Sequence, residues 1–228
     1  MKVSVLMPIY NDENNLFNSI NSILNQSYKN FELIIVNDAS TDNTLEVLEK
    51  FKNLDSRIKV FTNNKNIGLT KSLNLALAKS EGELIARQDS DDLSLGERLK
   101  KQVELLQNSK YSFCVSRAIN SKTQKPIPRY SYYFPTKLVM NFKNPFIHGT
   151  LMIKKNVLNK LGGYNENFYY SQDFKLFFDL IRKHNKYFYI KEPLYVLNLE
   201  NNISTIKQKE QKYYFDCARK NITPNLII

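Results

Sequence analysis

The stretch that decides the fold is Glu83-Leu84-Ile85-Ala86-Arg87-Gln88-Asp89-Ser90-Asp91-Asp92. Its apolar run, bounded by Gly82 and by acids, predicts a short buried strand. The three aspartates then lie at the carboxyl end of that strand, where open α/β sheets bind their ligands. Carboxylates this close repel one another by roughly 1 kcal/mol or more per pair, even at a high effective dielectric. A bound Mg²⁺ or Mn²⁺ would offset this repulsion. A solvated acidic turn before the next helix is the alternative.

The alternation of strands and helices extends through the first half of the chain. Strands are predicted at residues 3–7, 31–36, 58–61 and 83–86, and helical apolar stripes at 16–24, 45–51, 69–77 and 95–106. We expect Pro8 to end the first strand, and Asp12 or Asn14 to cap the first helix. The pattern predicts an α/β fold with a mostly parallel central sheet flanked by helices. Three strands then end in acids, at Asp12, Asp38 and Asp89, on one edge of the sheet.

The second half of the chain is less regular. Strands are predicted at 113–115, 187–190 and 194–197, and helices at 157–161 and 174–181. Residues 120–137 are rich in proline and aromatic side chains, which either pack on the protein or stack on a sugar or base. The last residues, 200–228, are polar and basic before a short apolar end, and are expected to form a tail.

The composition is that of an ordinary globular protein, with 42% hydrophobic and 24% charged residues in a chain of 228. This length suits one α/β domain, and no apolar run approaches the roughly 20 residues of a transmembrane helix. The apolar stretch at the amino terminus is too short for a signal peptide. Cys114 and Cys217 lie far apart without a partner motif, which predicts free thiols in a reducing compartment such as the cytoplasm.

The formal net charge of +11 admits three kinds of partner: nucleic acid, an anionic membrane surface, or an anionic substrate. No nucleic-acid-binding motif of the usual types is visible, and the basic residues are spread along the chain. We therefore favour a membrane surface or a phosphate-bearing substrate, and no nucleic acid.

Five blocks of sequence, in this order along the chain, resemble the family 2 glycosyltransferases of the GT-A fold. They are residues 5–11, 22–28 with 31–42, 66–69 with Asn74, 89–92, and 148–150 with 172–173. The resemblance covers about residues 3 to 185. It implies a single Rossmann-like GT-A domain over residues 1–199, with a nucleotide-binding half at about 1–116 and an acceptor-binding half at about 117–199. A basic C-terminal tail at 200–228 would follow.

The resemblance implies transfer of a sugar from a UDP-sugar donor to a hydroxyl of a glycan or lipid-linked acceptor. Such reactions build lipooligosaccharide, capsule and other bacterial surface polysaccharides. The enzyme would work in the cytoplasm, at the inner face of the inner membrane, where its positive charge favours peripheral association with anionic lipid. A Mn²⁺ or Mg²⁺ cofactor would neutralise the charge on the leaving UDP. One carboxylate would take the proton from the attacking hydroxyl, and a single displacement of this kind inverts the anomeric configuration.

The site residues follow from matching positions in the family's motifs. By this match, Asp91 is the leading candidate for a direct metal ligand, Asp89 would lie near the ribose and the metal, and Asp92 would lie close by. Asp38 matches the acid that binds uracil or ribose. The full set of candidates for nucleotide binding is Pro8, Tyr10, Asp12, Asp38, Asn66, Lys71, Asp89, Ser90 and Asp91. For Lys71, a solvated helix face is the competing interpretation.

The catalytic base and the acceptor side fall in the second half. Asp173 matches the base, and Gln172 and His148 match positions on the acceptor side. Asp173 also fits the N-cap of the following helix, and His148 fits a structural role equally well. The family's base motif is commonly Glu-Asp, whereas this chain has Gln172-Asp173. Family members often carry a histidine that reaches the metal, yet residues 197–204 contain none. A catalytically inactive subunit that binds a sugar nucleotide or glycan is therefore the alternative function.

Overall fold

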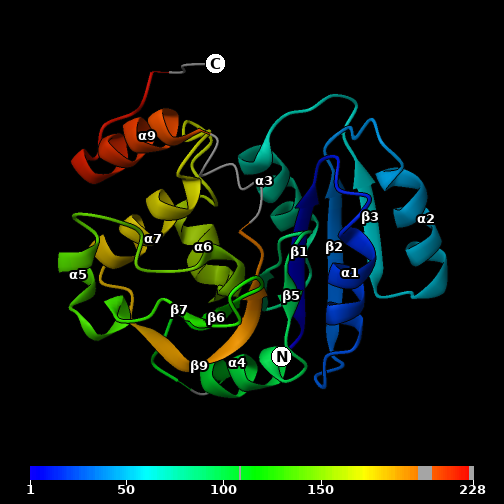
Figure 1. Ribbon diagram of the computed structural model, residues 1–228, viewed down its shortest axis with the longest axis horizontal. Coiled ribbons are helices and arrows are strands. Elements are labelled where there is room, and N and C mark those ends of the chain that lie inside the picture. Colours follow the sequence, from blue (N-terminus) through cyan, green and yellow to red (C-terminus); the bar gives the residue numbers. More distant parts are fainter. Residues whose placement is uncertain (108, 200–206, 226–228) are drawn as a thin grey trace.

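A computed structural model describes residues 1–107, 109–199 and 207–225 (Figure 1). The strands are β1 (Val3–Ile9), β2 (Phe31–Asn37), β3 (Ile58–Thr62), β4 (Leu84–Arg87), β5 (Leu93–Ser94), β6 (Phe113–Asn120), β7 (Pro126–Ile127), β8 (Met152–Lys154) and β9 (Tyr187–Leu197). The α-helices are α1 (Leu16–Leu24), α2 (Thr44–Leu54), α3 (Leu69–Lys79), α4 (Arg98–Gln107), α5 (Thr136–Val139), α6 (Lys155–Leu161), α7 (Gln172–Arg182) and α9 (Gln208–Lys220). Two 3₁₀ turns are η1 (Ser131–Tyr133) and η2 (His148–Thr150).

The strands form one sheet in the order β3-β2-β1-β4-β8-β6-β9-β5, and β7 pairs with β6. The first four strands run parallel to one another, so their carboxyl ends meet at one edge, where Ile9 lies beside Asn37 and Asn37 beside Thr62. The antiparallel strand β8 then connects β4 to β6, which runs parallel to β9. This arrangement confirms the predicted α/β fold and its mostly parallel sheet.

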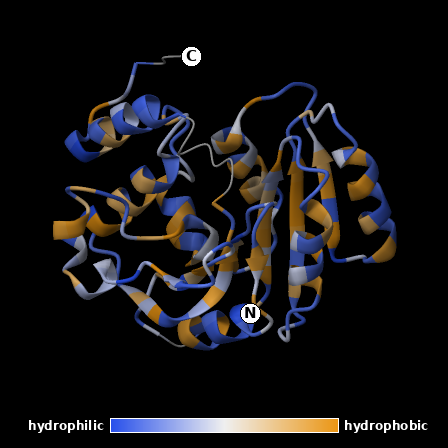
Figure 2. Ribbon diagram, in the orientation of Figure 1, coloured by the Kyte–Doolittle hydropathy of each residue, from blue (hydrophilic) through white to orange (hydrophobic). Residues whose placement is uncertain are grey.

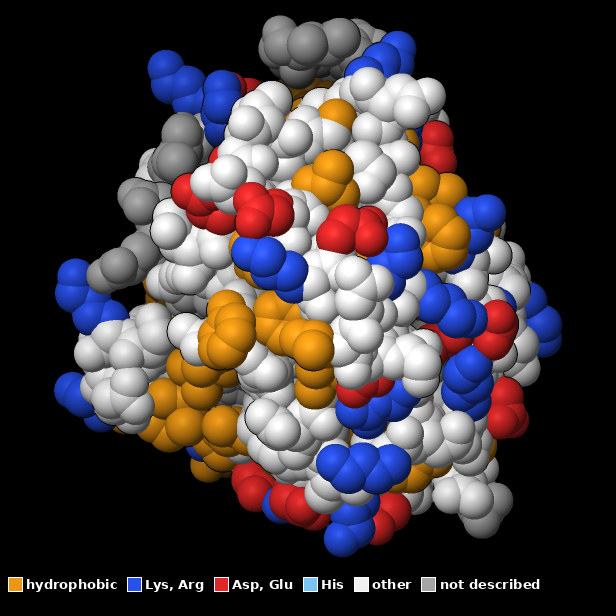
Figure 3. Space-filling model, turned by 90° about the vertical axis from the view of Figure 1, so that its right-hand side faces the viewer, with side chains coloured by type: hydrophobic (Ala, Val, Ile, Leu, Met, Phe, Trp, Pro, Cys, Tyr) orange, Lys and Arg blue, Asp and Glu red, His pale blue; other side chains and the backbone are white. Residues whose placement is uncertain are grey.

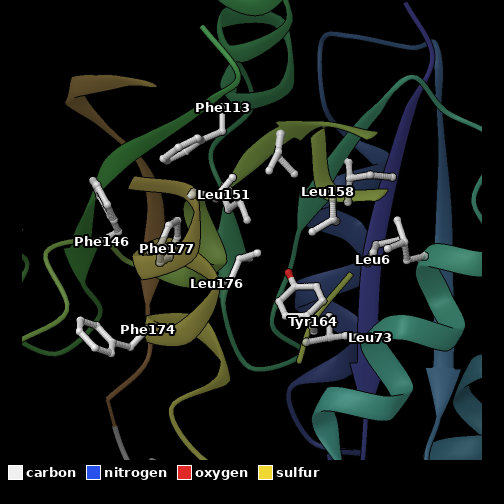
Figure 4. Packing of buried hydrophobic residues seen from close by; sticks show 14 of the residues in the cluster. Leu6, Leu73, Phe113, Phe146, Leu151, Leu158, Tyr164, Phe174, Leu176 and Phe177 are labelled. Carbon is white, nitrogen blue, oxygen red and sulfur yellow. The ribbon is translucent and has the colours of Figure 1, made fainter. Parts of the chain in front are cut away.

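Two apolar cores cover the opposite faces of the sheet, because successive side chains of a strand point to opposite faces. In β1, Val5 and Met7 belong to the core formed with α1, α2 and α4. Leu6 belongs to the other core, with α3, α6 and α7. Figure 4 shows Leu6 beside Leu73 and Tyr164 in that second core. Each fully buried side chain of this kind stabilises the fold by about 1.5–3 kcal/mol, and Figure 2 shows the strands as the most hydrophobic segments.

The start of the chain differs in two details from the expectation. Pro8 does not end β1 but lies within it, beside Val36 of β2. Proline has no N–H to donate to a neighbouring strand. It is tolerated at this position because the pairing of β4 with β1 ends at Leu6, so that no strand pairs with that side of β1 at Pro8. The first helix begins at Leu16 with Asn15 in the N-cap position, so neither Asp12 nor Asn14 is the cap.

The second half contains more regular structure than the sequence predicted. The two strands expected at 187–190 and 194–197 are one strand, β9, whose pairing with β6 shifts register near Pro193. The aromatic segment at 120–137 holds β7, η1 and the start of α5. Within the expected tail, residues 208–220 form α9, which packs against α7 and buries Tyr214 and Cys217. Residues 200–206 and 226–228 of that expected tail lie outside the described ranges. None of the helices in the described ranges is long and apolar enough to cross a membrane.

Candidate functional site

The side chain of Gln88 supports the acidic loop (residues 89–92), which follows β4. This fully buried amide donates hydrogen bonds to the backbone oxygens of Asp89 (3.0 Å) and Asp92 (2.9 Å). Its own oxygen accepts a hydrogen bond of 2.6 Å from the Ser94 hydroxyl. The Ser19 hydroxyl of α1 also donates to the Asp89 oxygen, at 2.9 Å. Both ends of the loop are therefore fixed to the sheet and to α1, which is the pre-organisation that a binding loop requires.

A buried arginine and a buried tyrosine support the same loop. The guanidinium of Arg98 donates to the Arg87 backbone oxygen (2.7 Å) and lies over the ring of Tyr195, 4.9 Å from its centroid. Burial lowers the pKa of Arg98 to about 10. The Tyr195 hydroxyl accepts a hydrogen bond of 3.0 Å from the backbone N–H of Asp89. A Cβ atom on Gly149 would lie 2.6 Å from that hydroxyl oxygen, so only glycine leaves room for Tyr195.

The three aspartates of the loop have different surroundings. Asp92 is buried, and its Oδ1 accepts a hydrogen bond of 2.7 Å from the Asn198 N–H, so it is engaged within the protein. Burial and the charges of Asp89 and Asp91 raise the pKa of Asp92. Asp89 is about one-third exposed (32%) and pairs with the buried Arg87. Burial, followed by the charge of Asp89, raises the pKa of Asp91 to about 6. Negative charge is therefore concentrated at Asp89 and Asp91.

These two carboxylates suit a divalent cation, since hard oxygen donors held close together are what Mg²⁺ and Mn²⁺ bind. Within residues 1–107, 109–199 and 207–225, no three acidic, histidine or cysteine side chains are grouped so that they could hold a metal ion. A cation at Asp89 and Asp91 would therefore need further ligands from outside the protein, such as phosphate oxygens or water. Asp91 also borders a pocket of about 330 Å³, which is lined by Asn15, Asn18, Asp91, Leu93, Ser121, Lys122, Val196 and Asn198.

Asp38 lies at the end of β2 and connects two loops. Its carboxylate accepts hydrogen bonds from the Asn63 side chain (2.7 Å) and from the backbone N–H groups of Ile67 (2.9 Å) and Gly68 (2.8 Å). The side chain is only 3% exposed. Asp38 thus fixes the loop after β3 to the edge of the sheet, and each oxygen of a carboxylate keeps some capacity to accept a further bond.

Around this loop lie the remaining candidates for nucleotide binding. Tyr10 is half exposed, Asn66 accepts a hydrogen bond of 3.1 Å from the Gly68 N–H, and Lys71 is exposed on α3. Asp12 is engaged with Asn15, whose amide donates to it at 2.6 Å. Pro8 lies in β1, and Ser90 is half-buried in the acidic loop.

Tyr169 is a neighbour of this region that the sequence did not indicate. A Cβ atom on Gly68, which has a φ of +87°, would lie 2.8 Å from the Tyr169 ring. Burial, the neighbouring Tyr170, and then Asp38 and Tyr10 raise the pKa of Tyr169. The second half of the chain therefore contributes an aromatic ring, 47% exposed, beside the loop that follows β3.

Asp173 lies in the first turn of α7, whose N-cap residue is Ser171, so the interpretation of Asp173 as the cap is wrong. Its Oδ2 accepts a hydrogen bond of 2.7 Å from the Asn144 amide. Burial raises the pKa of Asp173, and the negative charge of Asp89 raises it further. Gln172, beside Asp173, is buried.

His148 lies in η2, next to α7. Its Nε2 is 2.9 Å from the Tyr164 hydroxyl, and its ring packs edge-on against Phe177. Burial, together with the positive charge of Arg87, lowers the pKa of His148 well below its usual value. Burial therefore favours the neutral imidazole of His148, which lies in the core beside α7.

Comparisons with known proteins identify the family of the chain. The sequence profile described as Glycosyl transferase family 2 matches residues 4–177. The chain is 42% identical over 166 residues to the protein EpsE of Bacillus subtilis (strain 168), covering 72% of this chain and 60% of EpsE. It is 34% identical over 223 residues to the O-antigen biosynthesis glycosyltransferase WbnJ of Escherichia coli, covering 95% of this chain and 85% of WbnJ.

Solved structures share the fold at lower sequence identity. S. aureus TarS 1–349 in complex with UDP-GlcNAc superposes with a TM-score of 0.78 at 21% identity, covering 99% of this chain and 68% of that one. The mannosyltransferase PcManGT from Pyrobaculum calidifontis, in complex with GDP-Man and Mn²⁺, gives a TM-score of 0.76 at 20% identity, covering 98% and 65%. The chain spans 60% of the length of EpsE, and 60% of an uncharacterized glycosyltransferase of Haemophilus influenzae that is 32% identical to it.

Proposed function

Because this chain belongs to glycosyl transferase family 2, we propose that it transfers a sugar from a UDP-sugar to a hydroxyl of a glycan or lipid-linked acceptor, in the synthesis of a bacterial surface polysaccharide. The observation that carries this proposal is the acidic loop at the carboxyl end of β4, whose backbone is held in place by hydrogen bonds from Gln88 and Ser19 and whose sequence lies within the family match over residues 4–177. If the loop binds a cation and the donor diphosphate, a carboxylate such as Asp173 would be suited to deprotonate the hydroxyl that attacks the donor sugar.

Asp173 serves in this proposal as the general base. Its burial favours the neutral acid, and the hydrogen bond from Asn144 favours the carboxylate. The balance keeps the carboxylate basic enough to accept a proton from the acceptor hydroxyl. The oxygen then bonds to the anomeric carbon as the bond to the UDP oxygen breaks, which inverts the configuration in one displacement.

Asp91 and Asp89 would hold a Mn²⁺ or Mg²⁺ cofactor, together with the donor diphosphate. When bound, the cation would neutralise the charge that develops on the leaving UDP. Gln88, Arg98 and Tyr195 keep the loop backbone in position, and Asp92 serves the protein rather than the cation. WfgD of Escherichia coli, 31% identical to this chain over 186 residues, is named as a UDP-Glc-dependent glucosyltransferase, which supports a uridine donor.

The donor nucleotide would lie against the ends of β1 and β2, on the loop that Asp38 fixes. Tyr10 and Tyr169 offer exposed rings there, and an aromatic ring of this kind stacks well on a base. In this assignment residues 1–116 form the nucleotide-binding half and the acceptor-binding half begins at about residue 117. His148 and Gln172 border the acceptor, and the enzyme works at the cytoplasmic face of the membrane.

The test is turnover of a panel of UDP-sugars with and without Mn²⁺, combined with UDP binding by calorimetry. Asp173→Asn should bind UDP and Mn²⁺ as the wild type does but lose transfer. Asp179→Asn is the matched control, because this residue of the same helix pairs with Lys175 and should leave transfer unchanged. Failure of the wild type to bind UDP would contradict the proposal. UDP binding without turnover on any acceptor would favour the inactive binding subunit.

A further inference from the structure

Large hydrophobic side chains are exposed at an unusual density between residues 129 and 143. Of the thirteen that are exposed in the described ranges, five belong to this short segment, namely Tyr130 (58%), Tyr133 (66%), Phe134 (58%), Leu138 (53%) and Phe142 (78%). The segment comprises η1 and α5, which lies at the periphery of the molecule on the side away from α2 (Figure 1). We call it the 129–143 surface.

The other side chains of this segment anchor it to the fold. Tyr132 stacks on Tyr189 of β9, with ring centroids 5.7 Å apart and an interplanar angle of 18°. The hydroxyl of Thr136 is hydrogen-bonded to that of Tyr187. Val139 and Met140 are buried in or against the core. Because these side chains fix one side of the segment to the protein, the hydrophobic side chains on its other side point toward solvent.

The charged residues along this part of the sequence have one sign. Arg129, Lys137 and Lys143 flank them, and none of the three forms an ion pair within the described parts of the chain. Residues 105–165 contain no Asp or Glu but ten Lys and Arg. The opposite side of the molecule, around α2, differs in this respect. There basic and acidic side chains alternate (Figure 3), as in the Lys50–Glu46 and Lys52–Glu49 pairs.

We propose that the 129–143 surface docks on an anionic lipid bilayer. Aromatic rings and leucine insert at the level of the headgroups, while lysine and arginine reach the lipid phosphates beside them. Because residues 129–143 contain no Asp or Glu, the segment itself is not repelled by the negatively charged leaflet. Exposed hydrophobic patches of this kind mark interaction sites on folded proteins.

The surface also adjoins the proposed base. Asn144, which donates the hydrogen bond to Asp173, follows directly after Lys143. Docking would therefore bring the bilayer beside the acceptor half of the site. This part of the inference rests on the proposed function, because it assigns the acceptor to the membrane surface, as expected for a lipid-linked glycan.

The test is co-sedimentation of the full chain with vesicles of phosphatidylcholine alone or with one-third phosphatidylglycerol. The wild type should bind the anionic vesicles at least about tenfold more tightly than the neutral ones. Phe134→Ser combined with Phe142→Ser should lose about tenfold or more of that affinity. Leu45→Ser combined with Leu54→Ser, on α2, removes exposed side chains elsewhere and should bind as the wild type does. Lys137→Glu should weaken binding more than Lys29→Glu, which makes the same charge change on an exposed lysine between α1 and β2.

Equal binding to both kinds of vesicle, no binding to either, or equal losses in the test and control variants would each overturn the proposal. Concentration-dependent dimerisation that Phe134→Ser and Phe142→Ser abolish would instead assign the surface to a second copy of the chain. UDP binding measured on the same preparations separates this result from the proposed function, since the variants should bind UDP normally whether or not they bind vesicles. Unchanged melting temperatures would show that the variants are folded.

Discussion

The amide of Asn144 donates a hydrogen bond of 2.7 Å to Oδ2 of Asp173. The oxygen of the same amide accepts a hydrogen bond of 3.1 Å from the Phe146 N–H, which fixes its orientation. Asn144 is therefore a positioning residue that presents a donor, rather than an acceptor, to the proposed base. Because this bond forms with the charged carboxylate, it opposes the rise in the pKa of Asp173 that burial causes.

Replacing Asn144 with alanine should raise the pKa of Asp173. Less of the base would then be ionised at a given pH, so the acidic limb of the pH–rate profile should move to higher pH, with the largest loss of rate on that limb. UDP binding should not change. Asn141→Ala is the control, since the Asn141 amide only bonds to the Lys137 oxygen at the surface. An unshifted acidic limb would show that Asn144 does not influence the pKa of the base.

Asp91→Asn and Asp92→Asn should differ although the residues are adjacent. Loss of the Asp91 charge should weaken Mn²⁺-dependent UDP binding by about 100-fold. Asp92→Asn keeps the oxygen that accepts the Asn198 N–H, so its UDP affinity should stay within a few-fold of the wild type. Calorimetry with UDP, in Mn²⁺ and in EDTA, measures both. Equal losses in the two variants would show that Asp92 binds the cation as well.

Gly149→Ala should disturb the acidic loop through Tyr195, although Gly149 lies outside the loop. The new methyl group would lie within 2.6–2.7 Å of three atoms of Tyr195, and overpacking of this kind costs about 1–3 kcal/mol. Displacing Tyr195 also removes the acceptor of the Asp89 N–H, so Mn²⁺-dependent UDP binding should weaken with the stability. Gly96→Ala meets no atom within 4 Å and serves as the control. Urea unfolding and calorimetry on the two variants check this prediction.

Glu32 should make stability depend on pH. Burial alone would raise its pKa, but hydrogen bonds from Lys59, Ser4, the Glu81 N–H and Lys2 lower it to about 2. An acid whose pKa is lower in the folded state stabilises above its unfolded pKa of 4.5, and this contribution is lost as the pH falls toward 2.

Glu32→Gln should therefore reduce the free energy of unfolding by about 1–3 kcal/mol at pH 7 and by much less near pH 2. Urea unfolding at several pH values measures the difference. Glu46→Gln, which breaks an exposed pair with Lys50, should change the stability by less than about 0.5 kcal/mol. A constant difference between pH 7 and pH 2 would contradict the assignment.

The parallel half of the fold could be predicted because its signals are local. In β2, residues 33–36 form a continuous apolar run, and a helical stripe follows within a short distance. The acidic loop and Asp173 could be named from their neighbours in sequence. The second half was harder, since β9 crosses Pro193 through a register shift that only its pairing with β6 makes possible.

The support of the site could not be predicted, because it depends on contacts between distant parts of the chain. Tyr195 accepts the Asp89 N–H across 106 positions, and Asn144 reaches Asp173 across 29. Nothing in the neighbouring sequence indicates that a tyrosine in a strand or an asparagine in a loop supports a site residue elsewhere in the chain. The sequence likewise gives no reason for a glycine in the His148-Gly149-Thr150 block, whereas in the structure a side chain at Gly149 would collide with the ring of Tyr195.

The position of β9 between β6 and β5 has a consequence for synthesis on the ribosome. β5 immediately follows the acidic loop, yet it pairs only with β9 in the sheet order, about 100 residues later. The Asp92 carboxylate and the Asp89 N–H likewise acquire their partners only from residues 195–198. A nascent chain that has folded its first four strands therefore still has an unfinished acidic loop, because such long-range pairing forms late. The protein becomes able to hold its ligand only when nearly all of the described chain has emerged.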